Sequence, residues 1–301
     1  MPAWGELLDE LKDHKGTDGQ FIEALSVDSL RLKYLNKLSN YTGRNAIAYY
    51  SGWLSNRSMN VDINDSDMTG LMSAMKGLDY SKGLDLILHT PGGNPTAAEG
   101  MVNYLHSKFD SDIRVFVPQM AMSAGTMLAC ASKQIIMGKH SCLGPIDPQF
   151  GGIAAYNIVS EFTQAKEELS KNPNDRLFWE LQLKKYPVAF LYSVIDAINL
   201  SSALTEQWLE EYMLAGNPDK SNIAKKIVGQ LNTNNKSHSR HFSLDFCRTL
   251  GMSVSGLEEN QDLQELVLSV HHAFVITFDA TKASKIIENQ NGIMYVTRQQ
   301  D

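Results

Sequence analysis

The chain has 301 residues, of which 43% are hydrophobic and 20% are charged, and its formal net charge is −7. This balance is typical of a globular protein that buries a sizeable core. The acidic charge argues against nucleic acid as a partner, because nucleic-acid-binding proteins usually present a basic face. The first residues carry acids and no apolar run, so we expect no signal peptide.

Cysteine and histidine usage gives no sign of a metal centre. Cys130, Cys142 and Cys247 are widely spaced and form no CxxC pair, so we expect neither a disulfide framework nor a zinc site, and a reducing, cytoplasmic setting. His238 and His241 stand three residues apart, a spacing that can hold a metal, but no third ligand is evident. We therefore expect a polar loop there, no metal ion and no cofactor.

One uncharged stretch approaches the length of a membrane span. Residues 115–132, VFVPQMAMSAGTMLACAS, carry no charge over 18 positions. Pro118, Gln119 and Gly125 interrupt this stretch, and small residues dominate its second half. We therefore expect a buried strand, a turn and a buried helix, with no stable membrane insertion.

In chain order, strand and helix patterns alternate after a charged, helical first segment. The expected elements are a helical region over residues 1–40, strands over 46–54, 84–89, 113–118 and 134–138, and helices over 68–78, 96–109 and 123–132. This alternation predicts an α/β fold with a mostly parallel sheet flanked by helices. From about residue 175 the pattern is mostly helical, with a polar loop over 231–243, and residues 285–301 fit either a hairpin or a loose end.

Two glycines, Gly92 and Gly93, stand between the strand LDLILH and the next helix. Glycine leaves backbone N–H groups unshielded and tolerates positive φ. Bare N–H groups at such a place suit either phosphate binding or an oxyanion hole for acyl transfer. The phosphate hypothesis is weak, since the sequence has neither GxGxxG nor the GxxxxGK loop followed by Ser or Thr.

An acyl-transfer reaction needs a nucleophile, and the segment AMSAGTMLA offers Ser123. Ser123 follows the strand IRVFVP, and its small neighbours Ala121, Ala124 and Gly125 leave room for a substrate. The ends of adjacent parallel strands lie together, so we expect Ser123 near Gly93. A plain helix N-cap is the alternative role for this serine.

Several segments together resemble a known family. YTGRNAIAYYSGWL, GLDLILHTPGG, MSAGTMLA, LGPIDPQ and KIIENQNG, spread from about Leu32 to about Gly292, are similar in order to the serine dehydrogenase proteinase family. That family is related to Clp protease and signal peptide peptidase A and has the Clp protease/crotonase fold. The resemblance implies a serine peptidase with Ser123 as nucleophile and the N–H groups of Gly93 and Ala124 as oxyanion-hole donors. It also implies a homo-oligomer.

With this resemblance we expect a single domain in three parts. An N-terminal helical arm covers residues 1–40, a Clp/crotonase-like catalytic core covers 41–175, and a mostly helical part over 176–301 completes the same domain. Gly92 and Asp147 are expected to shape the substrate groove. Asp147 stands where Clp protease carries its histidine, so a Ser-His-Asp triad is not expected, and an Asp before Pro is also a common turn former.

Relatives of the signal peptide peptidase A type use a lysine as base, which must be desolvated to lose its proton. In NIVSEFTQAKEEL the residues Ile158, Phe162, Ala165 and Leu169 form an apolar helical stripe, and Lys166 is predicted to fall on it. Lys166 is therefore the expected general base. Its alternative is a position at the edge of the stripe, from which a lysine reaches water.

Other candidate bases are closer to the serine in sequence. Lys133 and Lys139 stand beside a short strand, and His140 belongs to the turn GKHSC, so all three are expected at the surface. His89 is expected to be a packed histidine at the end of its strand.

These observations predict a soluble, cytoplasmic serine peptidase with a Ser-Lys dyad that acts on peptides or proteins. Two alternatives remain open: a crotonase-like enzyme that binds acyl-CoA, and a catalytically inactive peptide-binding or assembly module of the same fold.

Overall fold

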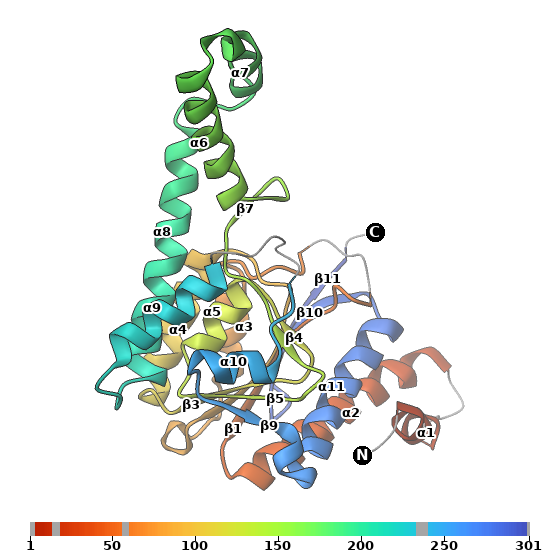
Figure 1. Ribbon diagram of the computed structural model, residues 1–301. Coiled ribbons are helices and arrows are strands. Elements are labelled where there is room, and N and C mark those ends of the chain that lie inside the picture. Colours follow the sequence, from red (N-terminus) through yellow and green to blue (C-terminus); the bar gives the residue numbers. More distant parts are fainter. Residues whose placement is uncertain (1–3, 14–18, 56–59, 233–239, 300–301) are drawn as a thin grey trace.

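The computed structural model describes residues 4–13, 19–55, 60–232 and 240–299. A seven-stranded sheet forms the centre of the molecule (Figure 1). Its strands, in spatial order, are β11 (Met294–Arg298), β10 (Ala283–Asn289), β1 (Asn45–Ser51), β2 (Leu84–His89), β3 (Ile113–Val117), β5 (Gln134–Met137) and β9 (Val254–Gly256). The run from β1 to β9 is parallel, whereas β10 and β11 join as an antiparallel hairpin at one edge. This architecture confirms the expected α/β fold.

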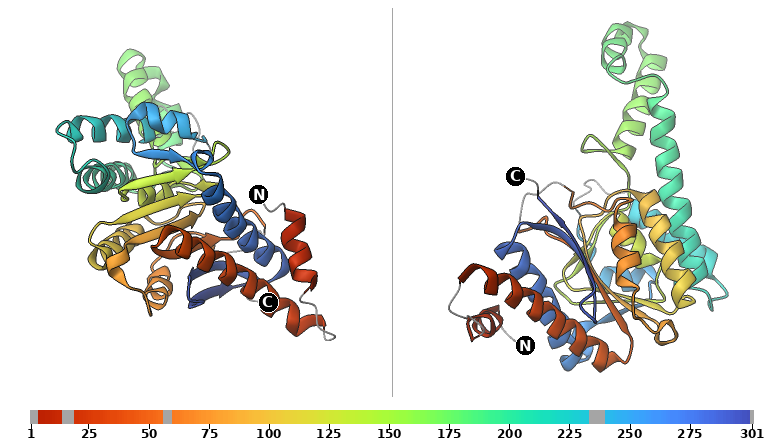
Figure 2. Two further views of the ribbon diagram at one scale, coloured as in Figure 1. Left: turned by 90° about the horizontal axis from the view of Figure 1, so that it is seen from below. Right: turned by 180° about the vertical axis from the view of Figure 1, so that it is seen from behind.

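Both faces of the sheet are covered by helices, which is why every residue of β1 and β2 is buried. Figures 1 and 2 show α2 (Gly19–Thr42) and α11 (Gln261–Ala280) side by side on one face, with α1 (Trp4–Asp13) packed beside them. The helices on the other face are α3 (Asp67–Ala74), α4 (Pro95–Phe109), α5 (Ala124–Cys130), α9 (Lys220–Asn232) and α10 (Leu244–Leu250). The first 40 residues, expected as an arm, thus pack on the body of the protein wherever their side chains are described.

The two cores follow the period-two pattern of the strands. Ile47 and Tyr49 of β1 enter the core beneath α3, α4 and α5, whereas Ala46, Ala48 and Tyr50 enter the core beneath α2 and α11. Successive side chains of a strand point to opposite faces, so a continuous apolar strand supplies both cores.

Residues 155–208 form a long helical protrusion from the body (Figure 1), except for the last turns, in which Leu204 and Trp208 pack into the main core. It consists of α6 (Ala155–Lys171), a short 3-10 turn (Pro173–Asp175), α7 (Arg176–Leu183) and α8 (Phe190–Trp208), and a π-helical turn (Leu209–Met213) follows it. Its own small core joins Ala155, Ile158 and Val194. The protrusion therefore has few buried residues and a large exposed surface.

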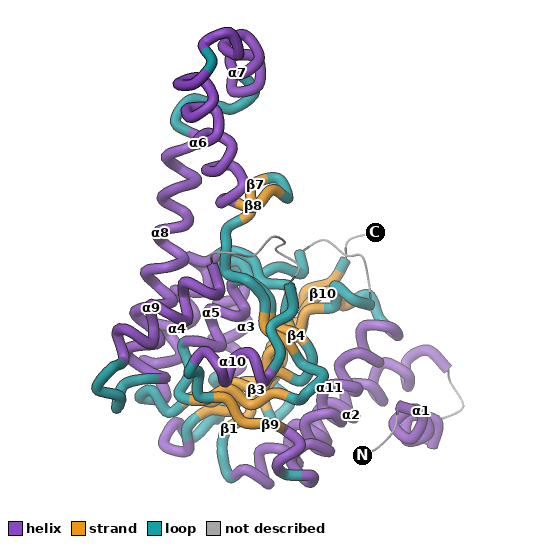
Figure 3. Tube along the Cα trace, in the orientation of Figure 1, coloured by secondary structure: helices purple, strands orange, loops and turns teal. Residues whose placement is uncertain are grey.

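Short elements complete the fold (Figure 3). Two small sheets pair β4 (Met120–Ala121) with β6 (Cys142–Leu143) and β7 (Gln149–Phe150) with β8 (Ile153–Ala154), and 3-10 turns cover Tyr80–Lys82 and Leu257–Glu259. The uncharged stretch at residues 115–132 forms most of β3, then β4 and α5, as expected. None of the helices in the described ranges is long and apolar enough to cross a membrane.

The C-terminal segment that the sequence left undecided is the β10–β11 hairpin. Part of the expected polar loop, residues 233–239 with His238, lies outside the described residues.

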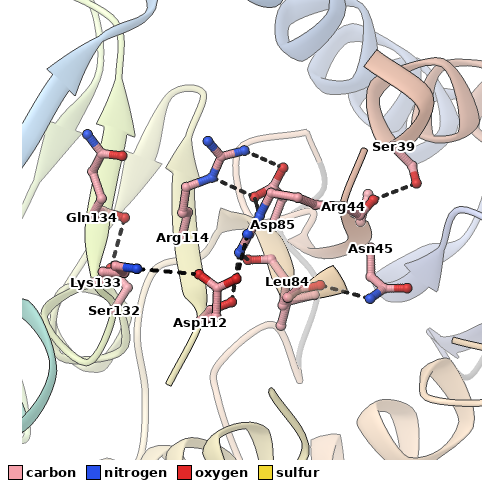
Figure 4. A network of polar contacts seen from close by, with 12 residues as sticks. Ser39, Arg44, Asn45, Leu84, Asp85, Asp112, Arg114, Ser132, Lys133 and Gln134 are labelled. Atoms are coloured by element: carbon pink, nitrogen blue, oxygen red, sulfur yellow. Dashed lines mark hydrogen bonds and ion pairs between the residues drawn. The ribbon is translucent and has the colours of Figure 1, made fainter. Parts of the chain in front are cut away.

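A charged network ties β1, β2 and β3 together at their amino-terminal ends (Figure 4). The carboxylate of Asp85, fully buried, accepts hydrogen bonds from Arg44 Nε at 2.8 Å and from Arg114 Nε and Nη2 at 2.8 Å each. Arg44 also binds Asp112 at 2.7 Å, and this contact lowers the pKa of the Asp112 carboxyl. The network lies at the opposite end of the strands from Gly93.

We expect Asp85→Ala to lower the free energy of unfolding by about 3 kcal/mol, because two partly buried guanidinium groups lose their shared carboxylate. Urea denaturation measures this change. Glu180→Ala is the control, since Glu180 pairs with Arg176 on the exposed tip of the protrusion and such pairs contribute little. Equal destabilisation by the two substitutions contradicts the prediction.

Candidate functional site

A cavity of about 500 Å³ opens at the carboxyl ends of β2 and β3. Ser123 lines this cavity together with the loop that follows β2. This agrees with the expectation that Ser123 and Gly93 lie together at the ends of adjacent strands. Its lining residues are Asp62, Pro91, Gly93, Pro95, Ser123, Ala124, Met127, Ile146, Pro148, Gln149, Phe150, Ala197, Leu200 and Ser201. The structure thus brings together the serine and both expected N–H donors.

The backbone of Ser123 is strained. Its φ of 51° and ψ of −120° lie outside the regions that residues with a Cβ ordinarily adopt, and such a conformation costs on the order of 1–3 kcal/mol. Two hydrogen bonds of Met122 hold the turn: its N–H donates to Thr90 O at 3.0 Å, and its carbonyl accepts from Gly125 N at 2.8 Å. The turn presents the Ser123 side chain at the mouth of the sheet.

The Ser123 hydroxyl makes no capping hydrogen bond, although the residue occupies the N-cap position of α5. The alternative role as a capping serine is therefore not realised. Within the described residues, no hydrogen bond of this hydroxyl is found. A strained turn with a free hydroxyl is the arrangement that exposes a nucleophile.

Each of the two glycines has a different neighbour. Gly92, with φ of 98°, lies so close to the serine turn that a Cβ there would come 2.6 Å from Ser123 Cβ. A Cβ on Gly93 would clash with the backbone N and O of Ile63. Both positions need glycine because the chain passes here between the backbone of the Ser123 turn and the backbone of Ile63.

The two residues that carry the expected N–H donors line the same cavity as Ser123. In the described part of the chain, the N–H groups of Gly93 and Ala124 donate to no other group, although both residues line the cavity. Ala124 opens α5, so its N–H is one of the helix's unpaired donors. Paired N–H donors beside a hydroxyl can stabilise the oxyanion of an acyl-transfer intermediate.

Lys166 does not lie where the sequence predicted. Ile158 and Ala165 are buried, but Phe162 is only half-buried and the Lys166 side chain is exposed. Because α6 packs mainly against α8, only a narrow stripe is covered, and Lys166 lies one position past it. It also lies about 16 Å along the helix axis from the base of the protrusion, at a rise of 1.5 Å per residue. The expected burial of this lysine is therefore wrong for the single chain.

The other candidate bases are also absent from the cavity. Lys133 and Lys139 are exposed, and Lys133 lies 3.8 Å from Asp112. His140 is exposed, with its Nε2 2.9 Å from Pro118 O. Of the described residues that line the cavity, none is a lysine or a histidine.

His89 is a packed strand-end histidine, as expected. It is buried on the α11 face of the sheet, and its ring lies 4.3 Å from Trp53, 5.3 Å from Tyr50 and 5.2 Å from His271, between centroids. Burial lowers the pKa of His89 to about 3, and burial followed by the nearby His89 lowers that of His271. Both rings are neutral near pH 7.

Asp147 is buried beneath the cavity wall and does not line the cavity. It accepts a hydrogen bond from Gln149 Nε2 at 3.0 Å. The residues on either side of it, Ile146 and Pro148, do line the cavity, and Ile146 N donates to Leu231 O at 3.1 Å. Gly92 does not line the cavity either, but it lies against the turn that carries Ser123.

Sequence reasoning missed the contribution of α8 to the site. Ala197, Leu200 and Ser201 line the cavity, and their i, i+3, i+4 spacing places them on one helix face. That spacing signals a packed face but not what it packs against. Asp62 was missed as well, since its segment has no strand or helix pattern.

Possible metal ligands do not gather in the part of the chain that the structure describes. In the described ranges, no group of three or more His, Cys, Asp or Glu side chains is placed to hold a metal ion. His241 is exposed, and its expected partner His238 lies outside those ranges.

We expect stability to fall as the pH drops from 6.5 towards 3. In that window the unfolded chain protonates His89 whereas the folded chain does not, so this residue removes about 1.4 kcal/mol of unfolding free energy per pH unit. Urea denaturation between pH 5 and 8 measures the slope. His89→Phe, which binds no proton, should have a shallower slope, and the exposed His241→Gln should keep that of the parent. A His89→Phe slope equal to the parent's contradicts the prediction.

Comparison with known proteins finds one matching family model and two similar proteins. A family model described as ClpP-like SDH-type serine proteinase matches residues 57–178, a range that contains Gly93, Ser123 and Lys166. Two uncharacterized proteins of Methanocaldococcus jannaschii are similar. MJ0137 is 31% identical over 198 residues, covering 60% of this chain and 68% of the relative. MJ1495 is 26% identical over 197 residues, covering 65% of this chain and 59% of the relative.

Proposed function

Because this chain belongs to the family of ClpP-like SDH-type serine proteinases, we propose that it is a serine peptidase with Ser123 as its nucleophile. One observation carries the proposal. A strained serine with a free hydroxyl shares a cavity of about 500 Å³ with two unpaired backbone N–H groups. A hydroxyl and two N–H groups in this arrangement favour attack on a carbonyl carbon. They do not indicate a structural role, because the hydroxyl does not cap the helix.

The proposed reaction follows from these positions. Ser123 Oγ attacks the scissile carbonyl, and the carbonyl oxygen, now negative, accepts hydrogen bonds from the N–H groups of Gly93 and Ala124. The Ser123 proton passes to a general base, which transfers it to the leaving amine as the C–N bond breaks. Water then attacks the acyl-enzyme, the same base accepts the proton of the water, and the proton returns to Ser123 Oγ as the ester bond breaks. Each N–H donor of this kind contributes roughly 10²–10³ in rate.

A peptide suits the cavity better than an acyl-CoA. The wall is formed largely by apolar side chains, including Met127, Phe150 and Leu200, which fit the side chain of a peptide substrate. No described residue of the lining is a lysine or arginine, the groups that bind nucleotide phosphates.

The reaction also needs a general base that accepts the proton of Ser123. We keep Lys166 as the base of a Ser-Lys dyad and infer that it acts on a cavity of a second copy. Two observations support this inference. Lys166 is exposed on a protrusion that extends from the body, and the described lining of the cavity in the same chain contains neither a lysine nor a histidine. Docking against a second copy would bury the lysine. Burial disfavours the charged form of a lysine, and only the neutral amine can accept a proton.

The tip of the protrusion supports a homo-oligomer. Leu177, Phe178, Leu181 and Tyr192 are more than half exposed, and Val188 is 99% exposed. A cluster of large apolar side chains at the tip of one protrusion is unusual for a monomer and marks a contact surface. The charges on the protrusion are of both signs, which suits contact between identical copies.

We expect a fluorophosphonate probe to label Ser123. Ser123→Ala should remove the adduct and lower peptide hydrolysis by roughly 10⁶-fold, the effect of deleting a serine-protease nucleophile. Ser201→Ala is the matched control, because Ser201 lines the same cavity but donates its hydroxyl to Ile198 O. Peptide mapping by mass spectrometry locates the adduct. If Ser123→Ala hydrolyses peptides as fast as the parent protein, the proposed mechanism is wrong.

We expect Lys166→Ala to lower hydrolysis by roughly 10²–10⁴-fold, as for loss of a general base. Coexpression of Ser123→Ala with Lys166→Ala should restore activity, because one copy then supplies the serine and the other the lysine. Lys171→Ala, an exposed lysine in the last turn of the same helix, is the control and should stay active. If the coexpressed pair is as inactive as each variant alone, Lys166 does not act between copies.

A further inference from the structure

A buried ion pair lies apart from the cavity, between β10 and α3. Lys285 of β10 and Asp67 of α3 are 1% and 0% exposed, and Lys285 Nζ lies 2.6 Å from Asp67 Oδ1. Tyr49 of β1 donates its hydroxyl to the other carboxylate oxygen at 2.7 Å. Taking two charges out of water is costly, so such a pair is weak evidence for stability by itself. Its contacts with the backbone indicate what it does.

The ion pair holds the segment of residues 61–64. Lys285 Nζ donates to the carbonyl of Asp62 at 2.6 Å, and the other oxygen of Asp67 accepts from Asn64 N at 3.0 Å. Ser51 Oγ, at the end of β1, donates to Val61 O at 2.7 Å. The segment is thus fixed on both sides of Ile63 by groups of the sheet and α3.

Ile63 in turn holds the glycine turn. Its N–H donates to Gly92 O at 2.7 Å, and its carbonyl accepts from Asn94 N at 2.8 Å. Ile63 and Gly93 form a parallel bridge, so Gly93 lies against the Ile63 backbone with no room for a Cβ. A displacement of residues 61–64 would displace the glycine turn with it.

The direction of the Gly93 N–H depends on this contact. Gly92 C=O and Gly93 N–H belong to one planar trans peptide unit, in which they point in opposite directions. When Gly92 O accepts from Ile63, the Gly93 N–H is therefore turned away from Ile63, and Gly93 lines the cavity. A rotation of this peptide would remove the donor from the oxyanion position.

We propose that Lys285 and Asp67 are positioning residues, which set the direction of the Gly93 N–H through residues 61–64. This inference rests on the proposed peptidase function of Ser123. Neither residue lines the cavity, so neither is a catalytic residue. They act through two hydrogen-bonded steps, from the ion pair to Asp62 and Asn64 on either side of Ile63, and from Ile63 to Gly92.

The test compares Lys285→Met with Glu288→Gln. Glu288 lies three residues along the same strand in a second buried ion pair, with Arg31 Nε at 2.7 Å, but that pair lies on the α2 side and has no contact with residues 61–64 among the described interactions. We expect Lys285→Met to lower kcat by roughly 10-fold or more, up to the 10²–10³ of a lost oxyanion donor, with little change in KM. Glu288→Gln should leave both constants near those of the parent.

Hydrogen–deuterium exchange provides a readout that is independent of activity. Peptides covering residues 60–66 and 90–96 should exchange faster in Lys285→Met than in Glu288→Gln, because the Ile63 and Asn94 amides lose their fixed partners. If Lys285→Met does not fold, Lys285→Met combined with Asp67→Asn replaces it, since this pair leaves no unpaired buried charge.

Parent-like kcat together with parent-like exchange in these peptides overturns the inference. Failure of the peptidase proposal is recognised separately, by absence of a Ser123 adduct in the parent protein. In that case the exchange comparison alone decides whether the ion pair positions the glycine turn.

Discussion

The site depends on close backbone packing at one turn. The Gly92–Gly93 peptide passes between the Ser123 turn and Ile63, and no side chain fits on either glycine. This contact sets the distance between a serine on one loop and an N–H on another. The strained conformation of Ser123 persists because two hydrogen bonds of Met122, to Thr90 O and from Gly125 N, fix the same turn.

Polar groups brace the parallel sheet at its two ends in different ways. At the amino-terminal ends, Asp85 joins three strands through two arginines, far from the cavity. At the carboxyl ends, Lys285 and Asp67 hold a loop against the glycine turn. The first network stabilises strand pairing, whereas the second directs an N–H group.

The protrusion separates the nucleophile from its proposed base within one chain. The middle of α8 lines the cavity through Ala197, Leu200 and Ser201. The N-terminal part of α8, together with α7, exposes apolar side chains to solvent. In the proposed mechanism, the site is complete only after copies associate. Assembly would then control activity, because an unassembled chain presents a serine and N–H donors without a desolvated lysine.

Local chemistry made much of this protein readable from its sequence. The alternation of buried strands and helices predicted the sheet, and glycines after one strand with a serine after the next predicted where the cavity would open. Burial of Lys166 was misjudged, because a helical stripe shows which residues share a face but not how wide its partner is. The roles of Ile63, Lys285 and the α8 residues came only from the tertiary structure. Their positions depend on contacts between segments up to 223 residues apart, which no local pattern encodes.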